Sequence, residues 1–347
     1  MKRRTFISGS VGSVVAGLAG LASWQFLRPQ AVAGVISRSA ELPSGLHLFA
    51  GADLAFGTTI GIQLLHHDQR QAELAIEDAF HEAKKIDALM SIYSEQSQVF
   101  QLNRDGRLSD PDPHLLVVLK EAQRLSVLTE GAFDITVQPL WIKFSQAAKS
   151  HTLPPTDEVR HAKSLVNWRN LSVSPAQIAF NKPGMAITLN GMAQGYAVDL
   201  ALAAMQSRGI RHALLDTGEF ISTGNKSAQR RWTVGVQDPR DASAFTAALQ
   251  MDGRSVATSG DYETTFTPDF VHNHIFDPAT GDSPLELASV TVVAPTGLLA
   301  DGMSTALFVL GSKKAMALAA ETANVDVLLV DKQGKTWKTR TLRETLA

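Results

Sequence analysis

The sequence predicts an α+β fold, because helical and strand-like segments follow one another without the regular alternation that builds a parallel sheet. The segments from Asp68 to Met90 and from His114 to Thr129 carry apolar residues at helical spacing. Between residues 212 and 259, short apolar and β-branched runs instead succeed one another, separated by turn residues. These patterns favour antiparallel strands packed against a few helices.

In the first half of the chain, the segment from Phe56 to Leu65 is β-branched and apolar and is predicted to be the first strand. The segment from Met90 to Gly106 ends in turn residues and is predicted to be a loop. After the second helix come a mixed segment from Gly131 to Phe144 and a short polar helix bounded by loops. Short strands are expected near Leu171 and Ile178.

In the second half, a strand near Ile187 is expected to pass through a tight turn into a helix that ends at Gly209. A helix from 313 to 323 and a final strand from 325 to 330 are predicted close to the C-terminus. Further strands are predicted at 212–215, 220–223, 232–237, 245–251, 256–259, 274–276 and 289–294.

The N-terminus has the features of an export signal. The twin arginine Arg3-Arg4 precedes a weakly apolar stretch from Gly9 to Leu27, and Ala31-Val32-Ala33 supplies a small-x-small cleavage site. We therefore predict a twin-arginine signal peptide over residues 1–33 and a periplasmic mature protein. An uncleaved anchor is the alternative, and the many Gly and Ala residues disfavour it as a bilayer span.

Composition narrows the classes of function. The chain has 347 residues, no cysteine and a formal net charge of -2. The absence of cysteine excludes disulfides, thiolate metal sites and a cysteine nucleophile. The charge balance argues against a nucleic-acid-binding protein.

The segment from Pro295 to Gly311 is the strongest candidate for a chemical centre. Thr296 has the character of an N-cap and Gly311 that of a helix stop, and the helix between them is apolar on nearly every side. Asp301 and Thr305 nevertheless lie four residues apart on one face of it. A buried carboxylate needs a partner, and Mg²⁺ is one because it prefers oxygen ligands. A helix-capping or Arg-paired aspartate is the structural alternative.

Four glycine-marked clusters accompany that helix: Asn190–Tyr196, Thr258–Tyr262, His272–Gly281 and Gly131–Asp134. The first opens a helix, where backbone amides suit a phosphate, although tight helix packing explains its glycines equally well. In the third, Asp277 is expected to form a turn, and a zinc site on the two histidines is disfavoured without a third ligand.

Taken together and in this order, the clusters resemble the FAD:protein FMN transferase family, the ApbE-like flavin transferases. The resemblance covers nearly the whole mature chain. It is carried by the segments Met90–Asn103, Thr129–Trp141, Leu189–Asp199, Trp232–Pro239, Val256–Glu263, His272–Gly281 and Ala300–Gly311.

The resemblance implies an ApbE-like mixed architecture with a flavin-binding cleft between two intertwined subdomains, formed by residues 34–347 as one catalytic unit. It implies transfer of the FMN moiety of FAD to a Thr or Ser hydroxyl of an acceptor flavoprotein, with Mg²⁺ bound and AMP released. His274 and Asp301 become the catalytic candidates, and Gly191, Asp301 and Thr305 the metal ligands. The implied flavin-contacting residues are Phe56, Tyr93, Ala132, Phe133, Asp134, Thr188, Gln194 and Ile275.

This sequence departs from the family pattern at Phe56, Thr188 and Gln194, where many members carry Met, Asp and Lys or Glu. Together with Asp216–Glu219, Asn190 and Gln194 resemble the branch associated with nitrous oxide reductase maturation, whose acceptor is a membrane-bound flavoprotein facing the periplasm. The competing hypotheses are an FAD pyrophosphatase, in which water replaces the acceptor hydroxyl, and a non-catalytic flavin-binding protein.

Overall fold

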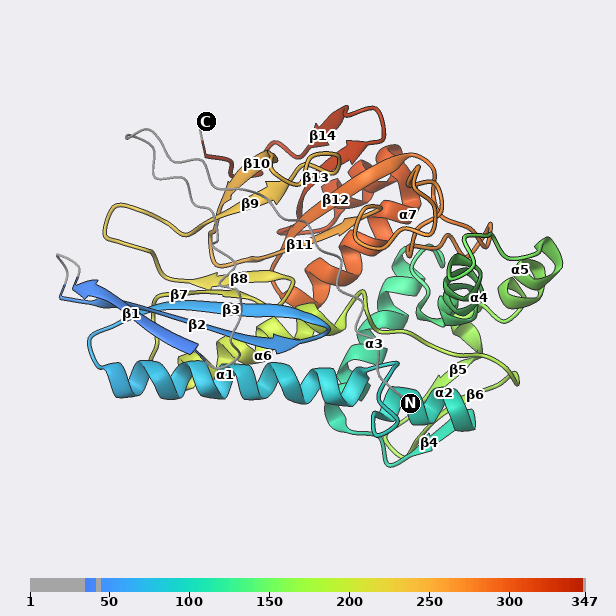
Figure 1. Ribbon diagram of the computed structural model, residues 1–347, viewed down its shortest axis with the longest axis horizontal. Helices are drawn as coiled ribbons and strands as arrows, with labels where there is room; N and C mark the ends of the chain where they lie inside the picture. Colours follow the sequence, from blue (N-terminus) through green and yellow to red (C-terminus); the bar gives the residue numbers. More distant parts are fainter. Residues whose placement is uncertain (1–34, 42–44, 346–347) are drawn as a thin grey trace.

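The molecule is built on one nine-stranded sheet (Figure 1). The computed structural model describes residues 35–41 and 45–345, so the export signal predicted over residues 1–33 lies outside the described residues. The strands follow the order β1-β2-β3-β7-β8-β11-β12-β13-β14, and every neighbouring pair is antiparallel. The α+β prediction is confirmed.

The strands of this sheet are β1 Val35–Glu41, β2 His47–Ala55, β3 Thr58–His66, β7 Ala213–Asp216, β8 Phe220–Thr223, β11 Ser255–Gly260, β12 Leu287–Ala294, β13 Asp326–Asp331 and β14 Thr336–Lys338. Strand β12 lies third from one edge of the sheet and is buried along its whole length, as expected of a strand covered on both faces.

One face of the sheet is covered by three helices, α1 Gln69–Met90, α6 Ala193–Ser207 and α7 Gly297–Glu321 (Figure 1). Each begins and ends for a local reason. Asp68 caps α1 by accepting a hydrogen bond from Gln71 N, and Thr296 caps α7 by accepting one from Leu299 N. Gly311 interrupts α7 with a left-handed φ of 75°, which confirms the predicted cap and the predicted break.

The opposite face is partly covered by a separate hairpin of β9 Thr233–Gln237 and β10 Phe245–Gln250. Val234, Val236 and Leu249 point from this hairpin into a second apolar cluster with Leu65 and Leu214 of the sheet.

A smaller subdomain flanks the sheet. It contains α2 Gln98–Asp105, α3 Pro113–Leu128, α4 Gln138–Ala148 and α5 Thr156–Lys163, two 3-10 turns at Ile135–Val137 and Trp168–Asn170, and a three-stranded sheet of β4 Arg107–Ser109, β5 Leu171–Val173 and β6 Gln177–Phe180. In Figure 1, α4 and α5 lie to the right of the large sheet.

Several predicted elements differ from the structure. The predicted loop at 90–106 contains α2, because Ser97 caps a helix there and Gly106 ends it with a left-handed φ of 73°. Strand β2 was not predicted, and β3 starts only at Thr58 because Phe56 belongs to the turn of the β2–β3 hairpin. No strand forms around Ile187 or at 274–276.

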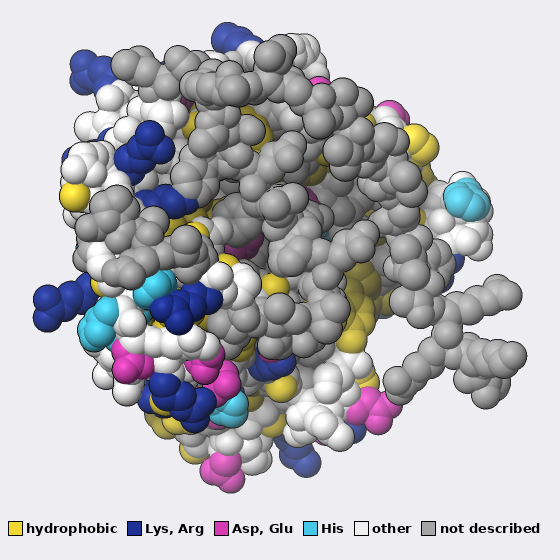
Figure 2. Space-filling model, turned by 60° about the vertical axis from the view of Figure 1, so that its left-hand side comes forward, with side chains coloured by type: hydrophobic (Ala, Val, Ile, Leu, Met, Phe, Trp, Pro, Cys, Tyr) yellow, Lys and Arg dark blue, Asp and Glu magenta, His cyan; other side chains and the backbone are white. Residues whose placement is uncertain are grey.

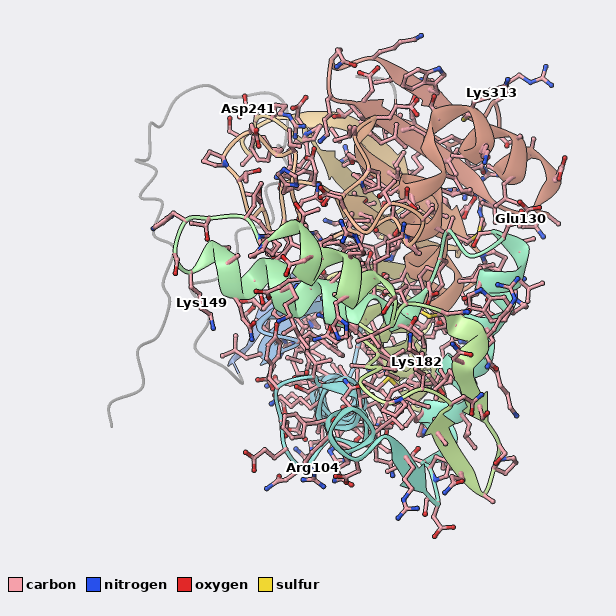
Figure 3. All side chains as sticks on the ribbon, turned by 90° about the vertical axis from the view of Figure 1, so that its right-hand side faces the viewer. Arg104, Glu130, Lys149, Lys182, Asp241 and Lys313 are labelled. Atoms are coloured by element: carbon pink, nitrogen blue, oxygen red, sulfur yellow. The ribbon has the colours of Figure 1, made fainter. Side chains whose placement is uncertain are left out.

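Charged side chains are spread over the surface. The exposed residues Arg104, Lys149 and Lys313 point outward in different directions (Figure 3). On the lower left of Figure 2, Lys and Arg lie beside Asp, Glu and His. Among the described residues, no helix is both long and apolar enough to cross a bilayer.

Helices α6 and α7 meet closely through two glycines. A Cβ atom on Gly195 would lie 2.1 Å from the Gly297 carbonyl oxygen, and one on Gly297 would lie 2.2 Å from the Gly195 carbonyl oxygen. Asp199 completes the contact because its carboxylate accepts hydrogen bonds from Gly297 N at 2.6 Å and Leu298 N at 3.0 Å. The N-termini of the two helices are thereby fixed against each other.

This close approach predicts that Gly195→Ala lowers the free energy of unfolding by at least about 1–3 kcal/mol, because the added methyl group meets backbone rather than a flexible side chain. Urea unfolding followed by circular dichroism measures the change. Gln206→Ala, on an exposed position of the same helix, serves as the control and should be nearly neutral. Equal urea midpoints for Gly195→Ala and the control would contradict the described contact.

Candidate active site

A cleft of about 2340 Å³ brings most of the predicted site residues together. Its wall is formed by the β2–β3 hairpin, the segment before α4, the start of α6, the ends of β8 and β11, the hairpin β9–β10 and one face of α7. The predicted residues that line it are Phe56, Ala132, Phe133, Asp134, Thr188, Gly191, Gln194, His274, Ile275, Asp301 and Thr305.

Tyr93 is the predicted residue that does not line the cleft. Its side chain is 69% exposed, and its ring centroid lies 6.2 Å from that of Trp141, which does line the cleft. Tyr93 therefore lies at the margin of the cleft, next to an aromatic ring that lines it.

Asp301 is buried at the bottom of this cleft. Its side chain accepts one hydrogen bond, from Gly195 N to Oδ2 at 3.0 Å, and its exposure is 4%. Among the described residues no Lys, Arg or His forms an ion pair with it. Burial, aided by the charge of Asp199 and opposed by the Gly195 hydrogen bond, raises the pKa of Asp301 to about 7. The Arg-paired alternative is thus not what the structure contains.

Thr305 lies on the same face of α7 as Asp301, and Gly191 packs against Thr305. A Cβ atom on Gly191 would lie 2.8 Å from Thr305 Oγ1, so only glycine lets the two segments approach this closely. Ser259 orients the threonine, since its Oγ lies 3.1 Å from Thr305 Oγ1 and 2.7 Å from Ser304 Oγ. The Gly191 segment therefore packs against the Thr305 hydroxyl, which lies one helical turn from Asp301.

These donors suit a hard cation. Mg²⁺ is bound in proteins by one or two carboxylates together with waters and substrate phosphates rather than by a full cage of side chains. The described residues contain no group of three or more His, Asp or Glu arranged to hold a metal ion. Asp301 and Thr305 contribute one carboxylate and one hydroxyl group to the lining of the cleft.

A second buried carboxylate, Glu219, also lines the cleft. It accepts a hydrogen bond from Thr258 N at 3.2 Å. Burial and the charge of Asp301 raise the pKa of Glu219 well above its ordinary value. Two buried carboxyl groups therefore lie at this end of the cleft, and each disfavours ionisation of the other.

Two predicted flavin contacts also have structural roles. Asp134 accepts hydrogen bonds from Thr136 N, Thr136 Oγ1 and Trp168 N at 2.8, 2.6 and 2.9 Å, so its carboxylate fixes the wall before α4. Gln194 donates from Nε2 to the Thr217 carbonyl at 2.8 Å. Both side chains therefore hold backbone segments of the cleft wall in place.

His274 faces the cleft from the long segment between β11 and β12. Its Nδ1 lies 3.1 Å from the Thr264 carbonyl oxygen, which can only accept, so Nδ1 carries the proton. Burial lowers the pKa of His274, while the Thr264 hydrogen bond and the charge of Asp261 oppose that effect. The imidazole is therefore neutral near pH 7, with Nε2 as a proton acceptor.

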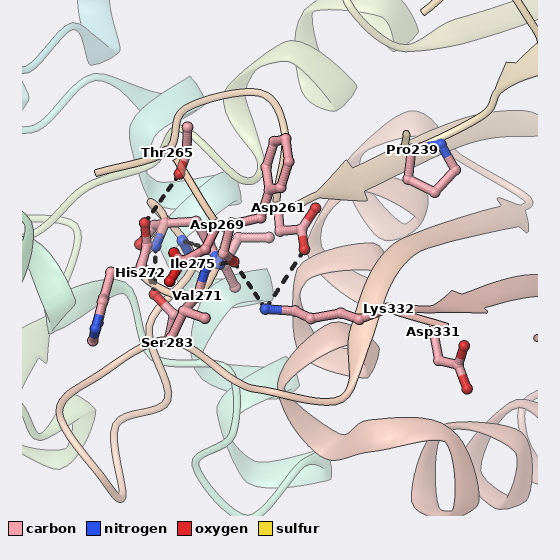
Figure 4. Close-up of polar contacts among 12 residues, drawn as sticks. Pro239, Asp261, Thr265, Asp269, Val271, His272, Ile275, Ser283, Asp331 and Lys332 are labelled. Carbon is pink, nitrogen blue, oxygen red and sulfur yellow. Dashed lines mark hydrogen bonds and ion pairs between the residues drawn. The ribbon is translucent and has the colours of Figure 1, made fainter. Parts of the chain in front are cut away.

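The segment that carries His274 is clamped at its start by a buried charge network (Figure 4). Asp261 has 0% exposure and binds Arg240 through two hydrogen bonds of 2.7 and 2.8 Å. Lys332 lies 3.6 Å from Asp261 and donates to the Phe270 carbonyl at 2.8 Å, while the Arg240 guanidinium stacks 4.5 Å from the Phe270 ring centroid. Arg240 and Lys332 thus connect the Asp261 carboxylate to the part of the loop that contains Phe270.

The aromatic cluster of Phe144, Phe266 and Phe276 attaches the same segment to α4. Within the segment, Asn273 is fully buried and exchanges hydrogen bonds with Ser283 through its backbone N and O, both at 2.8 Å. The loop is therefore a packed structure that holds His274 in one position.

Sequence reasoning assigned no role to Asp199, Glu219, Ser259 or the Asp261 clamp. The sequence does place Asp199 one turn beyond Gly195 and Ser259 next to Gly260, within the segments that carry the family resemblance. Their partners lie 21 to 99 positions away along the chain, and a single sequence gives no signal for such distant pairs.

Comparisons with known proteins agree with this geometry. Residues 56–329 match the sequence model of the ApbE family. A FAD:protein FMN transferase of Vibrio cholerae is 30% identical over 80% of this chain and 85% of its own, and one of Salmonella typhimurium is 32% identical over 73% of this chain and 75% of its own.

Solved structures show the same fold. The flavin transferase ApbE from Vibrio cholerae superposes with a TM-score of 0.74 at 25% identity, over 85% of this chain and 98% of its own. The ApbE protein of Thermotoga maritima gives a TM-score of 0.76 at 28% identity, over 85% of this chain and 97% of its own. Fold and cleft together define the class of protein as a flavin transferase. The chain belongs to the ApbE family.

The buried carboxylate predicts a pH-dependent stability. The pKa of Asp301 is about 7 in the folded protein, whereas its ordinary value is 3.8. As pH rises, the unfolded chain therefore loses this proton at a lower pH than the folded protein does. The free energy of unfolding of the metal-free protein should therefore fall as pH rises from about 4 to about 7. The Asn side chain of Asp301→Asn cannot ionise. The free energy of unfolding of this variant should exceed that of wild type by up to about 4 kcal/mol at pH 8, with no difference below about pH 4.

Urea unfolding in the presence of a chelator at several pH values measures this difference. Asp105→Asn, at a surface aspartate that is 47% exposed, is the matched control and should show no such gain at pH 8. A wild type as stable as Asp301→Asn at pH 8 would show that Asp301 carries no burial penalty.

Proposed function

We propose that this chain transfers the FMN moiety of FAD to a Thr or Ser hydroxyl of an acceptor flavoprotein, with Mg²⁺ bound and AMP released. Membership of the ApbE family supports the coarse activity. The observation that carries the finer proposal is Asp301: a carboxylate that is 4% exposed, unpaired with any described cation, and aligned with Thr305 in the cleft.

Asp301, Thr305 and the Gly191 carbonyl are the residues proposed to hold Mg²⁺. When bound, the metal neutralises charge on the pyrophosphate oxygens. The residues themselves contribute positioning: the Gly195 N–H orients Asp301 and the Ser259 hydroxyl orients Thr305. Glu219 is a second buried carboxyl group at the same end, and a bound cation would favour its ionised form.

Apolar side chains on the other wall suit the flavin ring. Phe133 and Ile275 are 4% and 5% exposed, and both line the cleft with Phe56. Such a wall excludes water from one face of a planar ring, and the few polar groups nearby fix its orientation. We propose that the flavin lies here and the pyrophosphate lies toward Asp301.

We propose that His274 acts as the general base. The acceptor hydroxyl oxygen forms a bond to the FMN phosphorus, and its proton passes to His274 Nε2. The bond between that phosphorus and the bridging oxygen breaks, and AMP leaves with the bonding electron pair. The neutral tautomer supports this role, because the Nδ1–H is already engaged by the Thr264 carbonyl.

Hydrolysis of FAD by water uses the same groups and is the competing outcome. We also propose that the protein acts in the periplasm after export by the twin-arginine route, since Arg3-Arg4 and the 31–33 cleavage motif precede the mature chain. A periplasmic flavoprotein domain, free or membrane-bound, would then be the acceptor.

The metal role predicts the behaviour of Asp301→Ala. With FAD, Mg²⁺ and an acceptor flavoprotein domain, wild type should add an FMN-sized mass to the acceptor and release equimolar AMP. Asp301→Ala should lose at least about 100-fold in rate, because it lacks the metal carboxylate. Mass spectrometry and nucleotide chromatography measure both products.

The surface variant Asp105→Ala should keep the wild-type rate. AMP and free FMN from FAD without flavinylation would assign the hydrolase instead. FAD binding without any AMP would assign a carrier. Unchanged turnover in Asp301→Ala would remove Asp301 from the metal site.

The proton-transfer role predicts that His274→Gln loses about 10²–10⁴-fold in kcat while its Kd for FAD stays near that of wild type. Because burial lowers the pKa of His274 from its ordinary value of 6.5, the acid limb of wild-type kcat should lie at a lower pH than that of an ordinary histidine. His272→Gln, two residues away and outside the cleft, is the control. An unchanged acid limb in His274→Gln would argue against the histidine as base.

A further inference from the structure

The cleft is larger than FAD needs. Sites for small molecules and cofactors usually enclose about 300–1,000 Å³, whereas this cleft has about 2340 Å³. The additional space forms a side arm, defined here by β9 on one side and by Ser37, Ala50, Gly61 and Gln63 of the sheet on the other. The arm is continuous with the end that holds Asp301 and His274.

Strand β9 presents an unpaired edge to the side arm. In the hairpin, Thr233 is opposite Gln250 and Gly235 is opposite Ala248. Gln250 N donates to the Arg343 carbonyl, and the Ala248 carbonyl accepts from Thr345 N, so both residues direct these groups away from β9. In an antiparallel pair of this kind, the residues directly opposite on the partner strand direct their own backbone N–H and C=O groups away from the first strand.

Thr233 and Gly235 therefore direct their backbone N–H and C=O groups away from β10. Within residues 35–41 and 45–345, those groups have no backbone hydrogen-bond partner. An exposed row of unpaired backbone N–H and C=O groups pairs readily with an extended chain.

The outer end of the side arm is cationic. Arg230 and Arg231, directly before β9, are exposed, line the cleft and form no ion pair with the described residues. The carboxyl groups of Asp301 and Glu219 line the inner end. A polypeptide that is acidic on one side of its hydroxyl residue would match the cationic outer end.

We propose that the side arm binds the acceptor protein. An extended, acidic segment of the acceptor adds to β9 as a third strand, and the adjacent Thr or Ser hydroxyl enters the cleft beside His274. This inference rests on the proposed function and deepens it by assigning the surface that recognises the protein substrate.

The test compares full-length wild type with two kinds of variant, using a purified acceptor flavoprotein domain and FAD. Thr233→Pro removes one outward N–H and leaves the β9–β10 ladder intact, and Thr233→Ala is its matched control. We expect Thr233→Pro to raise the KM for the acceptor at least about tenfold, with the Kd for FAD and the FAD hydrolysis rate without acceptor unchanged. Thr233→Ala should keep the wild-type KM.

The double variant R230E/R231E tests the charge independently, should Thr233→Pro fold poorly. It should raise the acceptor KM and reverse its dependence on salt between about 50 and 300 mM NaCl, whereas R230K/R231K should resemble wild type. Wild-type KM in both Thr233→Pro and R230E/R231E overturns the docking surface. If wild type binds the acceptor but forms no FMN adduct, the proposed function is overturned instead. The affinity of wild type for the acceptor, compared with that of the variants, then still tests the docking surface.

Discussion

The contact between the N-termini of α6 and α7 is the constraint on which the site depends. Gly195 and Gly297 allow the two backbones to meet, and the Gly195 N–H then reaches the carboxylate of Asp301. Without that contact, a carboxylate in an apolar helix would have no donor to stabilise it. Gly191, at the start of α6, packs against Thr305 in the same way, so close contacts at small residues bring Asp301 and Thr305 of α7 to the start of α6.

Much of the fold followed from sequence patterns, because the helices are bounded by strong local signals. The caps at Asp68 and Thr296 and the break at Gly311 are chemical features of single residues, and each lies where expected. Strand β2 and helix α2 escaped prediction for opposite reasons. The composition of β2 mixes His, Gly and Asp with its apolar residues, and α2 is a short polar helix whose start depends on Ser97.

The site was predictable only in part. Asp301 and Thr305 are four residues apart on one helix, so their common face follows from helical geometry. His274 and the cleft-lining residues came from the family resemblance, and the cleft contains all of them except Tyr93. The Asp261 clamp could not be inferred, because its cations come from two loops about 20 and 70 positions away in the chain, brought together by the order of the sheet.

The turn that carries Phe56 places an aromatic residue at the cleft in a costly backbone conformation. Phe56 has a left-handed φ of 53°, and its N–H is held at 2.9 Å by Asp87 Oδ2. A bulky residue in this conformation costs about 1–2 kcal/mol that Gly or Asn would avoid. Folding bears this cost, so the backbone that carries the Phe56 ring is set before any molecule enters the cleft.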